Sequence, residues 1–428
     1  LLASSAASDV YKRQEMTQSI FASAEIGWKS MLYLTLTGRN DWASQLKGSN
    51  PTSFFYPSVG LSAVISEMVT LPKAIDYLKV RGSFSSVGTP YPRFLVQPTY
   101  SYDPTKQDWN AKTHYPIGKL KPERTKSWEV GLDARILNDI SLNLTYYRSN
   151  TYNQTFYADL SLSSGYSNIP IQSGNIMNEG LEMSLGYNKQ WKDFSFNTNY
   201  TLTWNKNRVK RLADGVYNYA TGQPIQMPEL SPLTYGHTDA RLILRVGGSM
   251  GDVYGQRLLK RDLNGYILNE EGVGLAMENK ETYLGSILPK MNMGWSLGFG
   301  YKGVNLGMTF TGRFGGIVIS ETQSVLDAAG VSKVSADVRD AGGVQINQSK
   351  VSAQTYYQTI QGTAAYYTYS ATNVRLGELS LSYTLPKKWF DNKVGMTVGL
   401  VGKNLWMIYC KAPFDPESVA STDNFYQG

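Results

Sequence analysis

A charged pair beside a tryptophan ends an apolar stretch early in the chain. The sequence there reads MLYLTLTGRNDW, and Arg39 and Asp41 follow a run of alternating leucines and threonines. An arginine beside a carboxylate could form the polar rim of an active site. The same pair could instead mark the point where a strand leaves a membrane.

Alternation along this stretch places the pair on one face of a strand, because successive side chains of a strand point to opposite sides. The leucines within 32–36 share a face with Trp42, whereas Arg39 and Asp41 lie on the other face with the threonines. We therefore predict that the pair lies on the lumen-facing rim of a membrane strand. An exposed ion pair there contributes at most about 1 kcal/mol.

Aromatic residues gather in the segment 91–115, which reads YPRFLVQPTYSYDPTKQDWNAKTHY. Aromatic rings can line a sugar site, where Asp103 or Asp108 could accept hydrogen bonds from hydroxyl groups. A loop whose rings pack on their neighbours or on a partner is the favoured alternative. The candidates for a substrate-facing or partner-facing role are Tyr91, Phe94, Tyr100, Tyr102, Trp109 and Tyr115, with Tyr366 and Tyr367 in the second segment, AAYYTYSATN.

Metal and cofactor chemistry has little support. The only cysteine is Cys410 and the histidines are His114 and His237, which are too few for a multi-cysteine or histidine-based centre. DLNGYILNEEG at 262–272 has a passing likeness to a Ca²⁺ loop, but it lacks the third acidic position and the bidentate glutamate. The Asn-Gly pair within it predicts a two-residue hairpin turn instead. We predict no metal site and no cofactor.

Catalytic residues are not indicated either. No motif fixes two carboxylates at the separation that a glycosidase needs. No glycine-rich loop leads from a strand into a helix, so nucleotide binding has no support. We predict that the protein is not an enzyme.

The composition is typical of a large antiparallel β protein. The chain has 428 residues with 30 Tyr and 40 Gly, and only 18% of its residues are charged. No window approaches the roughly 18 consecutive apolar residues of a membrane helix. A β-barrel is then the only way for this chain to span a bilayer, because every backbone amide must be paired within the protein.

The positive charge is scattered along the chain. The net charge is +7, and the densest basic cluster is NKNRVKRL at 205–212. A nucleic-acid surface would need a basic stripe with stacking aromatics. We interpret the cluster as a solvated strand end and predict no nucleic-acid partner.

Two-residue periodicity predicts strands along most of the chain. VNLGMTF at 304–310 places its valine, leucine, methionine and phenylalanine on one face and Asn, Gly and Thr on the other. Most such segments have about ten residues, the length that crosses a bilayer at a tilt. Twelve strands are expected, near 19–28, 30–42, 55–66, 77–87, 127–137, 140–157, 180–190, 193–206, 293–302, 304–314, 372–385 and 393–408.

The connections favour a barrel over a sandwich, which would explain the alternating faces equally well. Short links alternate with long ones, the long ones being 88–126, 158–179, 207–292 and 315–371. Outer-membrane barrels show this rhythm, with short periplasmic turns and long extracellular loops. A propeller is disfavoured because no repeat of fixed length occurs. Four tryptophans near strand ends are expected to form interfacial girdles: Trp42, Trp204, Trp389 and Trp406.

Several phrases, in order, resemble the barrel of the SusC/RagA family of TonB-dependent outer-membrane transporters. They begin with LTGRNDWASQL at 36–46 and SFFYPSVGLSAVISE at 53–67, and continue through LKPERTKSWEVGLDARIL at 120–137. VGGSMGDVYG at 246–255 and ATNVRLGELSLSYTLP at 371–386 extend the series over nearly the whole chain. The ordered series is more specific than any one phrase.

The resemblance implies a function and partners. Such a transporter imports a nutrient, usually an oligosaccharide and sometimes a peptide, with energy from the TonB complex. A SusD-like surface lipoprotein would cover its extracellular loops. The alternatives are a TonB-dependent siderophore or cobalamin receptor, and a soluble β-rich protein that binds or hydrolyses glycans.

The resemblance also implies that the chain is partial. Barrels of this family are of the plugged, 22-stranded type, and we expect this chain to be the C-terminal portion, without the plug that contacts TonB and without the last strand. Residues 1–14 are expected to be a sequencing or assembly artefact or a non-native leader. The barrel portion is expected to span 15–428.

Overall fold

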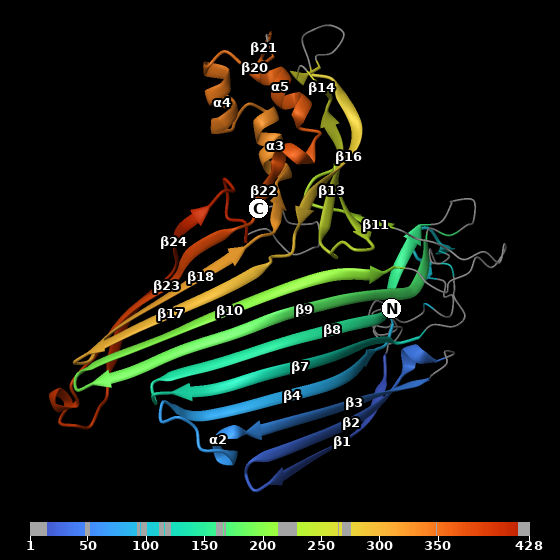
Figure 1. Cartoon of the computed structure of the whole chain (residues 1–428). Helices are drawn as coiled ribbons and strands as arrows, with labels where there is room; N and C mark the ends of the chain where they lie inside the picture. The colour runs from blue at the N-terminus through green and yellow to red at the C-terminus, as the bar shows by residue number, and fades with distance from the viewer. Residues whose placement is uncertain are drawn as a thin grey trace. The chain divides into compact units, whose positions relative to one another are not determined.

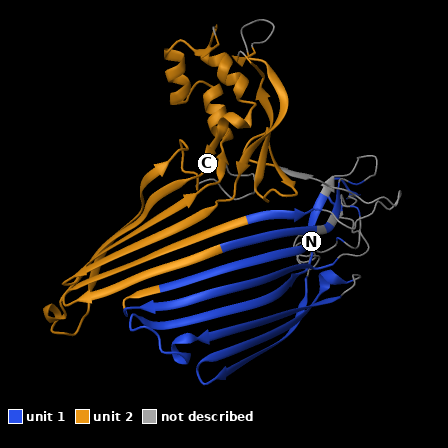
Figure 2. Cartoon of the chain, in the orientation of Figure 1, with its two compact units in different colours: residues 1–138, 142–180, 207–228 blue, residues 139–141, 181–206, 229–428 orange. Residues whose placement is uncertain are grey.

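The computed structural model describes residues 15–47, 52–91, 95, 101–110, 115, 121–159, 166, 168–212, 229–263, 265–267, 275–347 and 349–417. The chain forms two compact units (Figure 2). Unit 1 comprises residues 1–138, 142–180 and 207–228, and unit 2 comprises 139–141, 181–206 and 229–428. None of the helices in the described parts is long and apolar enough to cross a membrane.

Twelve strands form one antiparallel sheet, and each of them neighbours the next long strand along the chain (Figure 1). All twelve strands expected from the sequence are present, so that prediction is confirmed. The strands are β1 (Thr17–Trp28), β2 (Leu32–Ala43), β3 (Ser53–Val64), β4 (Ile75–Thr89), β7 (Glu123–Ile136), β8 (Ile140–Asp159), β9 (Asn168–Trp191), β10 (Phe194–Arg211), β17 (Met291–Tyr301), β18 (Val304–Phe314), β23 (Asn373–Thr384) and β24 (Thr397–Cys410).

The strands of unit 1 separate polar from apolar side chains. Residues directly opposite each other on antiparallel strands share a face, and the register pairs Ser62 with Arg81 and Lys79 with Asp133. The other face carries aliphatic and aromatic residues that are exposed, among them Leu61 and Val130. An exposed apolar face of this kind suits lipid rather than water.

The strands of unit 2 repeat the separation. Ser296 lies opposite Thr309 on one face, while Trp295 lies opposite Phe310 on the other. Glycines on the polar face make room for their neighbours: a Cβ at Gly307 would lie 2.5 Å from the Ser380 Oγ. The small side chains leave the polar face open while the apolar face is filled with rings.

Two strands are longer than the sequence predicted. β9 begins at Asn168 rather than near residue 180, and β10 runs to Arg211. The extension of β10 lacks apolar alternation. It is held to β9 by polar contacts, such as the 2.8 Å hydrogen bond that the Asn207 side chain donates to Asn178. The link between β8 and β9 is therefore only 160–167, and the strict alternation of short and long links is wrong at this point. The link 44–52 between β2 and β3 is a second exception, because it is no longer than 65–74 between β3 and β4.

The two longest links fold together in unit 2. We call residues 229–286 and 317–370 the insert domain. A four-stranded sheet in the order β11-β12-β13-β16 is joined by short helices and small hairpins (Figure 1). Its elements are β11 (Glu229–Thr234), β12 (Ala240–Arg245), β13 (Asp252–Leu259), β14 (Arg261–Asp262), β15 (Gly265–Tyr266), β16 (Met277–Ser286), β19 (Ile317–Ile319), α3 (Glu321–Ala328), α4 (Lys333–Asp340), β20 (Val344–Ile346), β21 (Ser349–Val351), α5 (Ala353–Ile360), η3 (Ala364–Tyr367) and β22 (Thr368–Ser370).

Serine caps begin the α-helices α3, α4 and α5 of the insert domain. The hydroxyl groups of Ser320, Ser332 and Ser352 each accept a hydrogen bond from the backbone N–H three residues later. The buried core lies between the helices and the sheet and consists of Leu259, Leu275, Ile346, Val351, Ala353, Tyr357, Ile360 and Tyr367. This folded body was not predicted, because the sequence was read there only as long links.

A buried polar cluster joins the two halves of the insert domain. His237 Nδ1 accepts from the Asp239 N–H at 3.0 Å, so its Nε2–H donates to the Gln361 carbonyl at 2.8 Å. The Asp239 carboxylate accepts from the Ala364 N–H at 2.9 Å and lies 3.3 Å from Arg257 Nε. Segments more than a hundred residues apart are therefore held together by fully used donors and acceptors.

Candidate binding surfaces

The polar face of unit 1 carries a network around Arg81. Its guanidinium donates to the Thr145 hydroxyl at 2.7 Å, and its Nε lies 3.8 Å from the Asp133 carboxylate. Asn143 also donates to Asp133. Gly131 lies opposite Arg81, and a Cβ there would lie 3.0 Å from Arg81 Cγ, so glycine makes room for the side chain.

A groove of about 200 Å³ lies over this network. Its polar lining combines hydroxyl groups with charges of both signs, including Ser62, Ser83, Lys79, Arg81 and Glu129. Such a surface can bind polar ligands by hydrogen bonds and ion pairs. Sequence reasoning missed these residues, although the strand parity that placed Arg39 would have placed them on the same kind of face.

The predicted charged rim forms a second cluster on this face. Arg39 Nε donates to Asp41 at 2.6 Å, and its NH2 donates to the Ser19 hydroxyl at 2.9 Å. The Tyr56 hydroxyl donates to the second Asp41 oxygen at 3.1 Å. Asp41 is buried, so its carboxylate is fully engaged by its neighbours. An adjoining groove of about 400 Å³ is lined by Phe21, Ser23, Thr37, Arg39, Tyr56 and Ser85.

The predicted aromatic segment divides into different environments. Tyr91 is only 2% exposed and packs in a core with Leu46 and Phe54, which fits the packing alternative. Tyr115 packs edge-on against Tyr166, with ring centroids 5.2 Å apart. Phe94 and Tyr100 lie outside the described residues.

Tyr102 and Trp109 form an exposed aromatic pair. They lie opposite each other on the hairpin of β5 (Ser101–Asp103) and β6 (Asp108–Asn110), with ring centroids 5.3 Å apart. Their side chains are 51% and 63% exposed. The two neighbouring carboxylates bind backbone instead: Asp103 accepts from the Thr105 N–H at 2.9 Å, and Asp108 accepts from the Trp109 N–H at 2.7 Å. The two rings are therefore open to solvent, whereas the two carboxylates hydrogen-bond to the backbone of the hairpin.

The second aromatic segment lies in the insert domain. Tyr367 is 2% exposed, and its ring is stacked on His237. Tyr366 is half-buried against the same core. Burial raises the pKa of Tyr367, and raises that of Tyr357 to about 12. These rings fit the packing alternative rather than an open ligand site.

The four tryptophans chosen for a girdle are all exposed, although only some of them lie near strand ends. Trp42 precedes Ala43, the last residue of β2, and Trp406 lies near the end of β24 at Cys410, whereas Trp204 lies inside β10, which continues to Arg211. Trp389 lies in η4 (Lys387–Phe390), the short link between β23 and β24. Their position fits the girdle, whose contact with lipid stays a prediction.

The remaining motifs have structural roles. Arg261 and Asp262 pair with Tyr266 and Gly265, so 262–272 begins as a hairpin, and the hairpin prediction is confirmed. Gly265 lies within the pairing rather than in the turn, and Asn264 lies outside the described residues. Within the described ranges, no three His, Cys, Asp or Glu side chains gather as a metal site. His114 lies outside these ranges, and Cys410 is a free thiol.

The family motif VGGSMGDVYG surrounds a buried carboxylate. Asp252 accepts hydrogen bonds from the Ser249 N–H at 2.9 Å and the Ser249 hydroxyl at 2.6 Å. The Tyr283 hydroxyl donates to it at 3.3 Å. A Cβ at Gly248 would lie 2.5 Å from the Asp252 carboxylate, so glycine is required there. The motif thus fixes the turn between β12 and β13.

Comparisons with known proteins agree with this architecture. The chain matches the family described as TonB dependent receptor-like, beta-barrel, over residues 2–405. It is 24% identical over 446 residues to TonB-dependent receptor P3 of Formosa agariphila, covering 97% of this chain and 43% of that protein. It is 25% identical over 224 residues to the TonB-dependent receptor SusC of Bacteroides thetaiotaomicron, covering 48% of this chain and 22% of that protein.

A solved structure shares the fold. The RagAB peptide importer in the 'open-open' state matches with a TM-score of 0.72 at 20% identity, over 94% of this chain and 44% of that chain. The chain thus spans less than half the length of these relatives. Its family match over most of its length, together with the twelve-stranded sheet, shows that it belongs to the TonB-dependent receptor β-barrel family of outer-membrane proteins.

Proposed function

We propose that this chain forms part of the wall of a TonB-energised importer that takes up an oligosaccharide across the outer membrane. The observation that carries the proposal is the division of the long strands into an exposed apolar face and a polar face with grooves. The polar face offers hydroxyl groups, amides and paired charges around Arg81 and Arg39. These groups can bind a polar cargo by hydrogen bonds and ion pairs as it passes.

The exposed pair Tyr102–Trp109 is our proposed sugar contact. Its rings are open, and the carboxylates beside it hold the hairpin in place. Tyr115 is a further proposed contact at the same segment. Arg39 and Asp41 are proposed to line the rim of the path. A peptide cargo is the second candidate, because RagAB, which shares the fold, is a peptide importer.

A SusD-like surface lipoprotein is the proposed partner. The insert domain supports this, because the two longest links form a packed body rather than open loops. The TonB complex is the proposed energy source, acting through a plug region of the whole protein. Co-purification of the lipoprotein with the whole protein from outer membranes tests the partnership.

Uptake of labelled cargo by cells tests the importer. Cells with the whole protein should accumulate a labelled oligosaccharide, and cells that lack TonB should not. Uptake that persists without TonB would contradict the proposal. Uptake of labelled peptides but not of labelled oligosaccharide would show that the cargo is a peptide.

Tyr102→Ala/Trp109→Ala should weaken oligosaccharide binding roughly tenfold, the change that corresponds to about 1.4 kcal/mol. The matched control is Tyr102→Phe/Trp109→Phe, which keeps the ring faces and should bind within about twofold of wild type. Equal losses in both variants would show that the pair acts through hydrogen bonding or folding rather than stacking.

A further inference from the structure

One strand of unit 1 carries its three acids and one arginine, Arg135, on the polar face, and its other two bases on the opposite face. In β7 the carboxylates of Glu123, Glu129 and Asp133 occupy odd positions, on the polar face with the Arg81 network. The even positions form the apolar face. Read from the short turn toward the long link, that face is Ile136, Ala134, Leu132, Val130, Trp128, Lys126 and Arg124. It changes from aliphatic to aromatic and then to basic.

The neighbouring strand β8 adds to the basic end. Thr151 contacts Thr125 at 2.9 Å and Thr145 accepts from Arg81, so the odd positions of β8 share the polar face. Tyr146 and Arg148 therefore lie on the apolar side. The Trp128 and Tyr146 rings confirm this, with centroids 5.4 Å apart.

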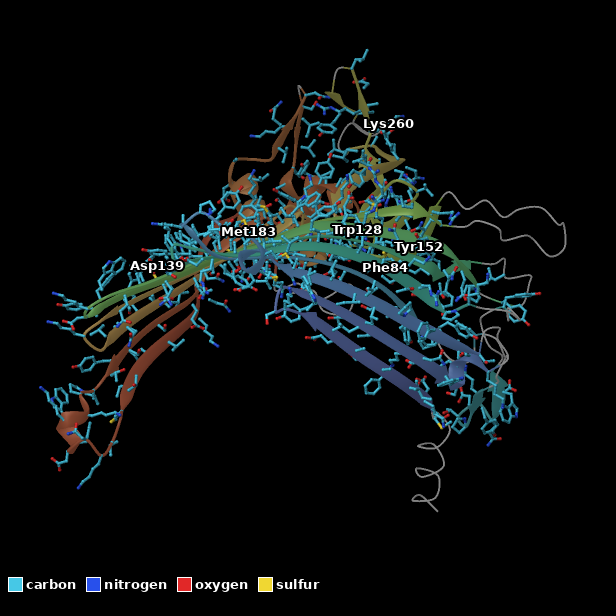
Figure 3. The ribbon with its side chains drawn as sticks, turned by 60° about the horizontal axis from the view of Figure 1, so that its bottom comes forward. Phe84, Trp128, Asp139, Tyr152, Met183 and Lys260 are labelled. Carbon is cyan, nitrogen blue, oxygen red and sulfur yellow. The ribbon has the colours of Figure 1, made fainter. Side chains whose placement is uncertain are left out.

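An aromatic ring lies beside one of these cations. Lys126 Nζ lies 5.8 Å from the centroid of the Tyr152 ring. Figure 3 labels Trp128 and Tyr152 on the adjacent strands β7 and β8, near Phe84 of β4. Tyrosine and tryptophan rings favour the level of lipid headgroups. The cations and the rings thus lie beside one another on the same face.

The cations of this patch are not neutralised by the parts of the protein that the structure describes. None of Arg124, Lys126 and Arg148 has a described carboxylate within ion-pair distance. One Arg124 nitrogen donates to the Phe55 carbonyl at 3.2 Å, which leaves its other donors for a ligand. Lys126 is exposed. Three positive charges beside an exposed apolar face suit an anion that also carries apolar groups.

We propose that Arg124, Lys126 and Arg148 bind the phosphate of an anionic membrane lipid, whose acyl chains lie along Val130 and Leu132. A lipid fits better than free phosphate or an acidic protein, because the cations continue an aliphatic face that only acyl chains would cover. Each cation at a membrane surface is worth about 1 kcal/mol toward anionic lipid, which is about fivefold in affinity.

The same order recurs within β10. There Trp204 is followed at two-residue steps by Lys206, Arg208 and Lys210. This strand contains the basic cluster that the sequence analysis interpreted as a solvated strand end. Cations thus lie beside aromatic residues on the apolar face of both β7 and β10.

Lipid retention by the whole purified protein tests the proposal. The protein in detergent is titrated with phosphatidylglycerol and with phosphatidylcholine, and bound lipids are counted by native mass spectrometry. Wild type should prefer the anionic lipid, and Arg124→Gln/Lys126→Gln/Arg148→Gln should lower its affinity for phosphatidylglycerol at least tenfold. Binding of phosphatidylcholine should change less than twofold.

The matched control removes the same charge from the insert domain. Lys260→Gln/Lys280→Gln/Lys333→Gln replaces three exposed lysines there and should bind phosphatidylglycerol like wild type. Equal losses in the two triple variants would overturn the proposal by showing a bulk charge effect. Equal binding of the two lipids by wild type would overturn it as well. Competition by inorganic phosphate at millimolar concentration, without lipid preference, would assign the patch to a free anion instead.

Discussion

The twelve-stranded sheet and the insert domain place their apolar side chains in opposite ways. In the sheet the apolar side chains are among the most exposed of the molecule, and Leu400 of β24 is 79% exposed. In the insert domain Tyr367 and Ile346 are 2% and 4% exposed. One chain therefore carries a surface for lipid and a core that water must not reach. An exposed leucine is unfavourable in water but favourable in lipid, so its exposure has to be judged against the solvent that the side chain faces.

The treatment of polar groups differs in the same way. On the sheet, polar side chains share one open face with grooves, as around Arg81. In the insert domain, polar groups such as Asp239 and His237 are buried with their hydrogen bonds made. Buried polar groups are costly when unpaired, so the insert domain needs a defined packing. The sheet needs only the alternation of polar and apolar side chains along each strand.

The largest expected effect is on the insert core. Tyr367→Ala removes a buried ring that stacks on His237 and should destabilise the insert domain by about 3–5 kcal/mol. Limited proteolysis of the whole protein in outer membranes should then cut within 317–370, while the barrel keeps its heat-modifiable mobility on gels. The exposed Val331→Ala is the control and should remain as resistant as wild type. Loss of the barrel band as well would show that the two regions fold as one.

A charge on the lipid face comes next. Leu297→Lys places a cation in the middle of β17 and should cost about 2–4 kcal/mol. Ser296→Lys lies on the polar face and should cost less than about 1 kcal/mol, because that face accepts charge. Chemical unfolding of the protein in lipid vesicles measures both. A larger cost at Ser296 than at Leu297 would reverse our assignment of the faces.

A smaller effect concerns the segment after β24. Burial opposes ionisation of Asp415, but hydrogen bonds from Arg375 at 2.8 and 3.0 Å and from the Glu417 N–H outweigh it, so the pKa of Asp415 is lowered. Because the pKa of Asp415 is lowered, its ionised form stabilises the folded segment at pH values above the ordinary pKa of a carboxyl group. This stabilisation is lost as the pH falls below about 4. Arg375 is buried but the Asp415 side chain is 40% exposed, so solvent screening limits the contribution of the pair to about 1 kcal/mol.

Hydrogen exchange tests the Asp415 pair. Protection of residues 411–417 in wild type, corrected for the intrinsic rate, should fall between pH 5 and pH 3. Asp415→Asn should have the lower protection throughout and no such fall. A variant that keeps the pH dependence of wild type would assign it to another group, such as Glu417, which also contacts Arg375.

The smallest effect is expected at the charged rim. Arg39→Ala should leave barrel assembly intact and change stability by at most about 1 kcal/mol, because the Arg39 side chain is half-exposed. The yield of folded barrel on a gel measures this. Tyr56→Phe, which removes one hydrogen bond to Asp41, is the matched control. Loss of assembly in Arg39→Ala alone would show that the pair is structural.

The sequence by itself determined the sheet. Two-residue periodicity located all twelve strands and their faces, because each strand must present apolar groups to one solvent and polar groups to another along its whole length. It also placed Arg39 with Asp41 on the polar face, which their contact with Ser19 and Tyr56 confirms. Family membership in turn excludes the soluble alternative, since these are outer-membrane proteins.

Only the tertiary structure decided the fold of the insert domain and which aromatic side chains are buried. Its helices have eight residues each, too short for a clear helical period. Tyr367 and Tyr102 look alike in sequence, yet one is buried and the other exposed. Burial depends on which distant segments pack together, as Asp239 and Ala364 do here. Local pattern fixes a strand and its two faces, whereas contacts between distant segments fix a core.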